Sequence, residues 1–315
     1  ESERGREMLD RRGEIFRERY LPRLGAFLGT HDLLKRLRAD GRKLVVATSA
    51  SGKDLSALLK QADLGDLMGK LDYLVGLGVN AIELMPLMEF AGDYSWGYNP
   101  AHIFAVEHTY GGPDALKTFV REAHRHGIAV LVDVVYNHFG PSDLPTWQFD
   151  GWSENGKGGI YYYQDERSHT PWGDTRPDYG RPEVRDFILD NARMWLRDYH
   201  VDGLRLDMTP YMRSVDGFTG DIPEGWEMMR MVGDLVRGDF PGRLVIAEDL
   251  HNDPAVTSTE DGGAAMHAQW DNQFVHPVRQ ALITPSDEHR SIPEVARAVM
   301  HSYHHAFDRV VYVES

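Results

Sequence analysis

The 315-residue chain carries 34 Lys and Arg against 49 Asp and Glu, which gives a net charge of −15, and it contains no Cys. This charge argues against a nucleic-acid partner, because phosphate binding needs clustered basic side chains. The lack of Cys excludes disulfides and thiolate metal sites, and no apolar run approaches the roughly 20 residues of a membrane-spanning helix. We therefore expect a soluble, cytoplasmic protein with neither nucleic-acid nor membrane partners, while its oligomeric state stays open.

Residues 1–68 differ in charge from the rest of the chain. They carry a net charge of +3, which leaves −18 for residues 69–315, and none of the 7 Trp lies in them. Such an asymmetry predicts a boundary near Met68, although no Pro/Gly/Ser linker marks it. We therefore treat 1–68 and 69–315 as two predicted domains.

The first of these domains is expected to be a short α/β segment. We expect a helix over 32–39, a strand over Lys43–Thr48 and a helix over 53–61, with Ser49 directly after the strand. This order resembles the middle of haloacid dehalogenase-like phosphatases, in which Ser49 would contact phosphate near a helix N-terminus. No Asp-x-Asp nucleophile precedes it, so a helix N-cap is the favoured interpretation of Ser49.

The next elements bring aromatic residues into a loop. A strand over Val79–Met85 ends at Pro86, and the loop 90–110 that follows carries Trp96 and Tyr98. Aromatic rings on a loop after a strand suit stacking on sugars, and a small aromatic core is the alternative. A helix over 113–126 begins with Pro at its first turn and ends before Gly127.

Two apolar segments carry charges that suit one another. The β-branched run 129–135 is typical of a strand buried on both faces, and Asp133 interrupts it. A buried carboxylate needs a partner, and Arg205 on a neighbouring strand would serve. Along 201–207 the alternation of a strand puts Arg205 and Asp207 on one face. The cation would keep Asp207 a carboxylate able to act as a nucleophile, and a purely structural ion pair is the alternative.

A third strand ends in an acid. The apolar segment 243–249 delivers Glu248 to its C-terminal end, the edge at which parallel barrels build active sites. Catalysis by two acids needs one ionised carboxylate as nucleophile and one protonated acid as proton donor. The sequence places no charge beside Glu248, so we expect burial or a neighbouring carboxylate to raise its pKa.

Further downstream the pattern predicts more βα units. We expect helices over 182–199, 226–237, 274–282 and 292–307 and a strand over 265–270, which makes seven strands in all. Between 139 and 181 lies a long irregular stretch rich in Trp and Tyr, and loops of this length are usually functional.

Several ordered motifs resemble the α-amylase superfamily, glycoside hydrolase family thirteen. Segments 133–138, 203–207 and 247–249 resemble its first three signature regions, and the similarity extends over about 71–315. The resemblance implies an α/β fold, an incomplete (β/α)8 TIM barrel with the long loop inserted after strand 3. It implies Asp207 as nucleophile, Glu248 as general acid/base, Tyr98, His138, Arg205 and Trp96 as substrate-binding residues, and Asp133 and Asn137 as supports of the site.

The implied activity is that of a retaining glycosidase or glucanotransferase on α-1,4-glucans or maltooligosaccharides. The loops 96–100 and 110–113 look most like those of glucan branching enzymes and maltooligosyl trehalohydrolases. Hydrolysis and transfer use the same catalytic residues, so the sequence does not separate them. Asn137 ligates calcium in some relatives, but we expect no metal and no cofactor.

Two features leave alternatives open. The segment 309–315 resembles the start of the fourth signature region, whose His-Asp pair does not follow, so we expect a truncated domain. A catalytically impaired glucan-binding fragment, a phosphatase-like remnant in 1–68 and a fusion without function are the alternatives. For the first barrel strand, we expect 43–48 to take its place, and a chimera of two unrelated fragments is the alternative.

Overall fold

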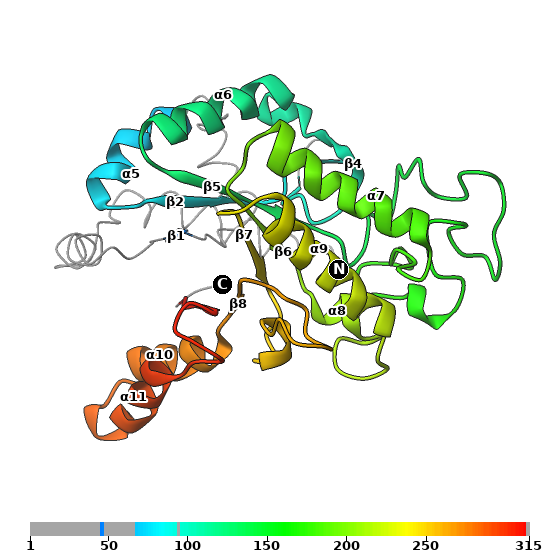
Figure 1. Cartoon of the computed structure of the whole chain (residues 1–315). Coiled ribbons are helices and arrows are strands. Elements are labelled where there is room, and N and C mark those ends of the chain that lie inside the picture. The colour runs from blue at the N-terminus through cyan, green and yellow to red at the C-terminus, as the bar shows by residue number, and fades with distance from the viewer. Residues whose placement is uncertain (1–44, 47–66, 93–94, 313–315) are drawn as a thin grey trace, which may run out of the picture.

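Seven parallel strands form the centre of the computed structural model, which describes residues 45–46, 67–92 and 95–312 (Figure 1). Their order in space follows the chain: β1 Val45–Val46, β2 Ala81–Leu84, β5 Ala129–Val134, β6 Gly203–Leu206, β7 Leu244–Ala247, β8 Ala268–Trp270 and β9 Arg309–Val310. Each strand pairs in parallel with the next. The sheet and its helices form an incomplete (β/α)8 barrel, and among the described residues the seven strands of this sheet lie at the predicted places in the chain.

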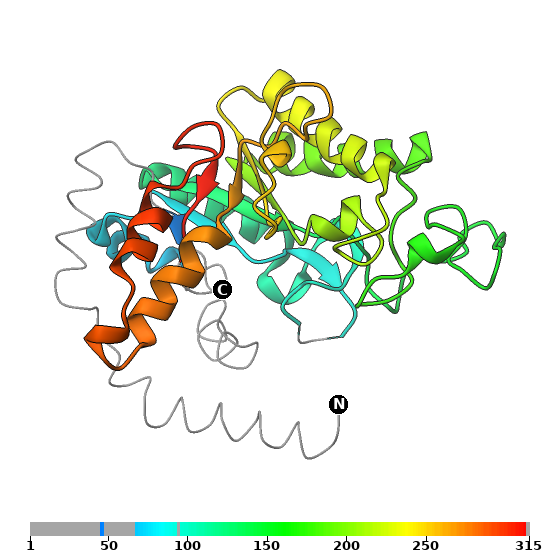
Figure 2. The ribbon, with the colours of Figure 1, turned by 90° about the horizontal axis from the view of Figure 1, so that it is seen from below.

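Helices connect the strands and cover the outer face of the sheet (Figures 1 and 2). They are α5 Leu71–Leu77, α6 Gly112–Arg125, α7 Pro182–Arg193, α8 Pro210–Arg213, α9 Pro223–Asp239, α10 Asn272–Ile283 and α11 Ile292–Met300. Helix α7 continues as the π-helix η5 Met194–Asp198, and short 3-10 turns lie at His108–Tyr110 (η3), Glu166–Ser168 (η4), Pro254–Val256 (η6) and Asp287–His289 (η7). In Figure 1 α10 and α11 lie together at the lower left, away from α6, α7 and α9.

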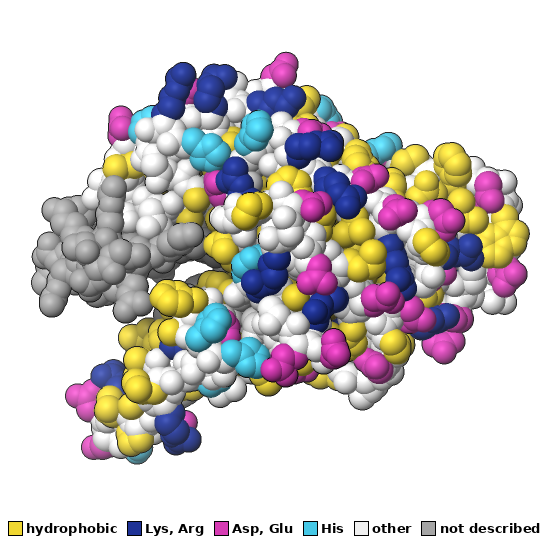
Figure 3. All heavy atoms as spheres, viewed as in Figure 1, with side chains coloured by type: hydrophobic (Ala, Val, Ile, Leu, Met, Phe, Trp, Pro, Cys, Tyr) yellow, Lys and Arg dark blue, Asp and Glu magenta, His cyan; other side chains and the backbone are white. Residues whose placement is uncertain are grey.

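Helix α6 shows why these residues form helices on the sheet. Leu116, Phe119 and Ala123 recur at helical spacing and are fully buried, so one apolar stripe faces the strands. Pro113 stands in the first turn, where its missing N–H costs no hydrogen bond, and Gly127 follows the helix with a φ of 71°. Acidic and basic side chains are interspersed on the outer face of the molecule (Figure 3).

Two sequence predictions about elements are wrong. The loop expected over 90–110 contains an antiparallel pair, β3 Met88–Phe90 with β4 Pro100–Val106, in which Ala101 and Ile103 are buried and alternate with exposed neighbours. The helix expected over 292–307 ends at Met300, because the Arg309 guanidinium donates to the last helical carbonyls.

The strand β1 occupies one edge of the sheet. Val45 pairs with Ala81 and Val46 with Ile82, in parallel. This is the place that the replacement hypothesis gives to the strand 43–48. Ser49 and the helices expected around it lie outside the described residues, and the division into two domains stays a prediction. Among the residues with described positions, no helix is long and apolar enough to cross a membrane.

Candidate active site

The C-terminal ends of β5, β6 and β7 bring one arginine and three carboxylates together. The parallel register sets Asp133 on β5 opposite Arg205 on β6, and Glu248 follows β7 with its N–H donating to the Leu206 carbonyl. Asp207 follows β6 directly and shares a face with Arg205, as the alternation of a strand requires. The cluster therefore follows from three neighbouring strands that end at the same edge.

Arg205 is the centre of this cluster. Its Nη1 donates to Asp133 Oδ2 at 2.6 Å and to Asp207 Oδ1 at 3.0 Å, and its Nη2 lies 2.8 Å from Glu248 Oε2. The residue is 3% exposed, so these contacts form away from bulk water and are strong. Its face packs on the Trp270 ring, with the guanidinium carbon 4.6 Å from the ring centroid. One planar fork thus fixes three acids relative to one another.

Asp207 is held by donors on both carboxylate oxygens. Arg205 contacts Oδ1, and the Asn137 Nδ2 donates to Oδ2 at 2.9 Å and to the backbone carbonyl of Asp207 at 2.8 Å. A carboxylate that only accepts hydrogen bonds suits these two donors. Asn137 Oδ1 lies 2.5 Å from His138 Nδ1, so both polar atoms of the amide have protein partners.

Glu248 has a pKa raised to about 7, because burial opposes its ionisation and the nearby Asp207 carboxylate repels a second negative charge. Arg205 and a backbone N–H, donated by Met208 to Oε2 at 2.9 Å, partly offset this rise in pKa. The sequence predicts no charged group beside Glu248, but in the structure the Arg205 guanidinium contacts it. The Arg205 side chain is long enough to reach across from β6 to the acid that follows β7.

Tyr98 and His138 line the cluster from the side of the inserted loops. Tyr98 donates its hydroxyl to Asp133 Oδ2 at 2.7 Å, and its carbonyl lies 2.9 Å from His138 Nε2. Burial lowers the pKa of His138 to about 4, so its imidazole is neutral at pH 7. The Trp172 ring stacks on His138 with centroids 4.6 Å apart and planes 14° apart.

Trp96 is the predicted site residue that the structure leaves apart from the others. It is 43% exposed and makes no ring contact or hydrogen bond with Tyr98, Arg205 or the acids among the described residues. Its role in substrate binding stays a prediction.

Four residues of the site were missed by the sequence reasoning: Glu83, Trp172, Trp270 and Tyr312. Burial raises the pKa of Glu83, whose charge acts on Asp133 and Arg205. Tyr312 packs on Trp270 at 4.8 Å between centroids. Glu83 and Trp270 stand near the ends of predicted strands, so the rule that led to Asp133 would have found them. Trp172 lies in the inserted loop, where no helical or strand periodicity indicates which way a side chain points.

A possible set of metal ligands lies on β3 and directly after β4, and it is already bonded within the protein. Glu89, Glu107 and His108 approach one another closely, and no ion is present. Glu107 Oε1 accepts from the Thr109 N–H at 2.9 Å, and Glu89 Oε2 accepts from the His108 N–H at 3.0 Å. These bonds explain why the three side chains lie together: Glu107 caps the 3-10 turn η3, and Glu89 binds the first residue of that turn.

Parts of this chain are similar to known proteins. Residues 38–148 match the family "Alpha amylase, catalytic domain". A malto-oligosyltrehalose trehalohydrolase of Saccharolobus solfataricus is 38% identical over 216 residues, covering 68% of this chain and 35% of that protein. Over these residues the chain is similar to the α-amylase superfamily.

Other members of the family show how far the similarity extends. A 1,4-alpha-glucan branching enzyme of Oceanobacillus iheyensis is 34% identical over 216 residues, which cover 64% of this chain and 33% of the enzyme. The crystal structure of a putative alpha amylase from Salmonella typhimurium superposes with a TM-score of 0.60 and 28% identity, covering 75% of this chain and 39% of that one. The chain thus spans about a third of the length of these curated relatives. The family match begins at residue 38 and includes β1, whereas the resemblance of 1–68 to phosphatases finds no support.

Proposed function

We propose that this chain supplies the catalytic site of a retaining glycosidase or glucanotransferase that acts on α-1,4-linked glucans. The observation that carries the proposal is that one buried residue, Arg205, contacts Asp133, Asp207 and Glu248. These contacts lie at the C-terminal ends of three neighbouring strands. Retaining enzymes need one carboxylate nucleophile and one protonated acid. The donors from Arg205 and Asn137 to Asp207 and the raised pKa of Glu248 support these two roles. The relatives named as trehalohydrolase and branching enzyme support an α-glucan as the substrate.

In the first step Asp207 attacks the anomeric carbon of the sugar. A bond forms between a carboxylate oxygen and that carbon, while the glycosidic bond breaks and its electrons go to the leaving oxygen. Glu248, protonated because its pKa is about 7, gives its proton to this oxygen. Arg205 and Asn137 hold Asp207 in position through one donor on each oxygen.

In the second step Glu248 acts as a base. The covalent sugar ester on Asp207 carries no negative charge, so one of the causes that raise the pKa of Glu248 is gone. The ionised Glu248 takes a proton from an incoming hydroxyl, which attacks the anomeric carbon and frees Asp207. Water as the acceptor gives hydrolysis, and a glucan hydroxyl gives transfer.

The test is turnover of amylose, followed by reducing-end release and by formation of α-1,6 branches. We expect activity in this chain and a loss of about 10⁴-fold in Asp207→Asn, which keeps the shape but removes the nucleophile. Asp261→Asn, at an exposed position, is the matched control and should leave turnover unchanged. Full activity in Asp207→Asn would contradict the assignment of the nucleophile. The product pattern would separate hydrolysis from branching. The expected cytoplasmic location of the protein stays a prediction.

A further inference from the structure

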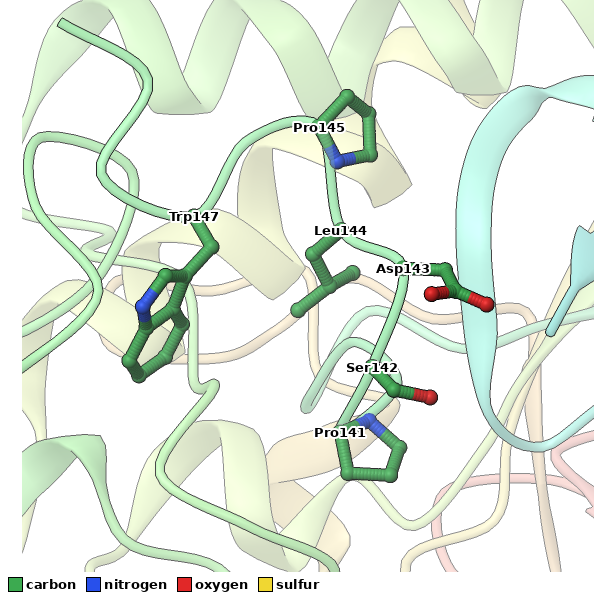
Figure 4. A pocket seen from close by; sticks show the side chains of 6 residues that line it. All are labelled: Pro141, Ser142, Asp143, Leu144, Pro145 and Trp147. Atoms are coloured by element: carbon green, nitrogen blue, oxygen red, sulfur yellow. The ribbon is translucent and has the colours of Figure 1, made fainter.

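A pocket of about 470 Å³ lies in the inserted loop and is built by one short stretch of chain (Figure 4). Its lining residues are Pro141, Ser142, Asp143, Leu144, Pro145 and Trp147. None of the acids that surround Arg205 lines it, so it is separate from the candidate active site. Its volume falls within the about 300–1,000 Å³ that is usual for small-molecule sites.

Trp147 forms a fixed wall of this pocket. Its ring packs on the buried Tyr162 with centroids 5.8 Å apart and planes 45° apart. The backbone N–H of Trp147 donates to the Leu144 carbonyl at 3.2 Å. A Cβ at Gly158 would lie 2.9 Å from the Trp147 ring and 2.3 Å from that of Tyr162, so this packing needs a glycine there. The indole is still 38% exposed. It is therefore an open platform that exists before any ligand binds.

The rim of the pocket is polar. Ser142 and Asp143 are exposed, and their side chains make no hydrogen bond or ion pair with any residue whose position the structure describes. Figure 4 shows Leu144 extending toward Trp147, whereas the Asp143 carboxylate extends to the other side of the loop. Trp147 and Asp143 thus lie on either side of Leu144 in this view.

The chemistry of the lining selects a class of ligand. No Lys, Arg or His lines the pocket, so a phosphate or another anion has no partner there, and one carboxylate is too few to hold a metal ion. A sugar ring presents an apolar C–H face, which suits the negative face of an indole, and hydroxyl donors, which suit the Asp143 carboxylate and the Ser142 hydroxyl.

We propose that this pocket is a second α-glucan site, with Trp147 as the stacking platform and Asp143 and Ser142 as hydroxyl partners. The choice of an α-glucan over other sugars rests on the proposed function. A polymer held here stays tethered to the protein while its chain end reacts elsewhere, which raises its effective concentration at the proposed active site.

The experiment is affinity electrophoresis of the intact chain through gels that contain increasing amounts of amylopectin. We expect retardation of the wild-type chain and, for Trp147→Ala, a dissociation constant about tenfold higher because one aromatic contact is lost. Trp147→Phe should recover part of the binding. Trp152→Ala is the matched control, because Trp152 is 37% exposed in the same loop and does not line the pocket. A thermal melt of each variant separates loss of binding from loss of fold.

Two outcomes would overturn the proposal. One is retardation of Trp147→Ala equal to that of the wild type, and the other is loss of all retardation in Tyr98→Ala, which would locate the polymer in the active site alone. Turnover of maltotetraose distinguishes this failure from failure of the proposed function. Binding of amylopectin through Trp147 without cleavage of maltotetraose would support the second site and contradict the proposed activity. Cleavage of maltotetraose without binding through Trp147 would support the proposed activity and contradict the second site.

Discussion

Arg205 shows how one residue can organise an active site. Its guanidinium is in contact with three carboxylates and an indole face, and its Nε is the one nitrogen of the fork that is buried without a partner among the described residues. Desolvation opposes a buried charge, and the surrounding acids together with the Trp270 face offset that cost. Arg205 therefore fixes the positions of those acids.

The first prediction concerns replacement of this fork. Arg205→Lys keeps the charge, but a single ammonium group cannot contact Asp133, Asp207 and Glu248 at once. We expect kcat/KM on maltooligosaccharides to fall about 10²–10³-fold, the usual cost of removing one fixed donor from a reacting site. Arg243→Lys is the control, since Arg243 pairs with Asp202 at the N-terminal ends of the strands, away from the three acids. Equal losses in both variants would show that Arg205 acts on stability alone.

The second prediction follows from the protonation of Glu248. Its pKa of about 7 means that the acid form is lost as the pH rises through neutrality, so kcat/KM should decline above pH about 7. The measurement is the pH profile with a maltooligosaccharide and with an α-glucosyl fluoride, whose leaving group needs no proton. The decline should be absent for the fluoride. A decline that is equal for both substrates would assign it to another group.

At the scale of elements, the two ends of the strands do different work. Asp202, just before β6, accepts a hydrogen bond from the Val130 N–H at 2.8 Å and forms an ion pair with Arg243, while its own carbonyl accepts from the Leu244 N–H at 3.0 Å. One residue thus ties β5, β6 and β7 at their N-terminal ends. The acids of the site lie at the other end, and a barrel generally separates stability from chemistry in this way.

A third prediction tests that separation. Asp202→Ala removes the side-chain acceptor and should lower the free energy of unfolding by about 1–3 kcal/mol, because a buried N–H and a guanidinium lose their partner. Since the candidate site lies at the C-terminal ends of the strands and Asp202 at the N-terminal ends, kcat/KM should not change below the melting transition. The measurements are urea unfolding and amylose turnover. Asp198→Ala, which breaks an exposed ion pair with Arg197, is the control and should leave the unfolding midpoint in place.

The elements also show what the sequence could predict. The βα order, the strands that carry Asp133, Arg205 and Glu248, and the edge at which they meet all follow from apolar runs ending in charged residues. The antiparallel pair of β3 and β4 was missed because short strands in an aromatic loop resemble loop sequence. The reach of a side chain is a property of three dimensions, and so the contact of Arg205 with Glu248 and the stacking of Trp172 on His138 could not be read from spacing.

At the scale of the whole molecule, the site is an exception to the rules that hold elsewhere. Asp133, Arg205 and Asp207 are nearly fully buried, and both Asp133 Oδ1 and Arg205 Nε are buried without a hydrogen bond in the described part of the chain. Buried charge destabilises a fold unless partners compensate it, so this region limits the stability of the barrel. In the proposed mechanism the same arrangement supplies the proton, so the proposed function predicts that activity and stability are opposed here.

The fourth prediction measures that opposition through the dependence of stability on pH. In the unfolded chain Glu248 loses its proton near pH 4.5, whereas in the fold it keeps it to about pH 7. Its contribution to stability is therefore fully present below pH 4.5 and is lost as the pH rises to 7. Glu248→Gln has no such proton to lose. From pH 5 to pH 8 the variant should gain stability relative to the wild type, on the order of 2 kcal/mol.

Other groups change the absolute curve but not this difference. Burial lowers the pKa of His138 and of His267 to about 4, so the unfolded chain takes up protons near pH 6.5 that the fold does not, and acid destabilises the protein. These histidines are present in both proteins, so their effect cancels when Glu248→Gln is compared with the wild type by urea unfolding at each pH. A constant difference from pH 5 to pH 8 would mean that Glu248 ionises alike in the folded and unfolded chain, and the proton donor would then have to be another residue.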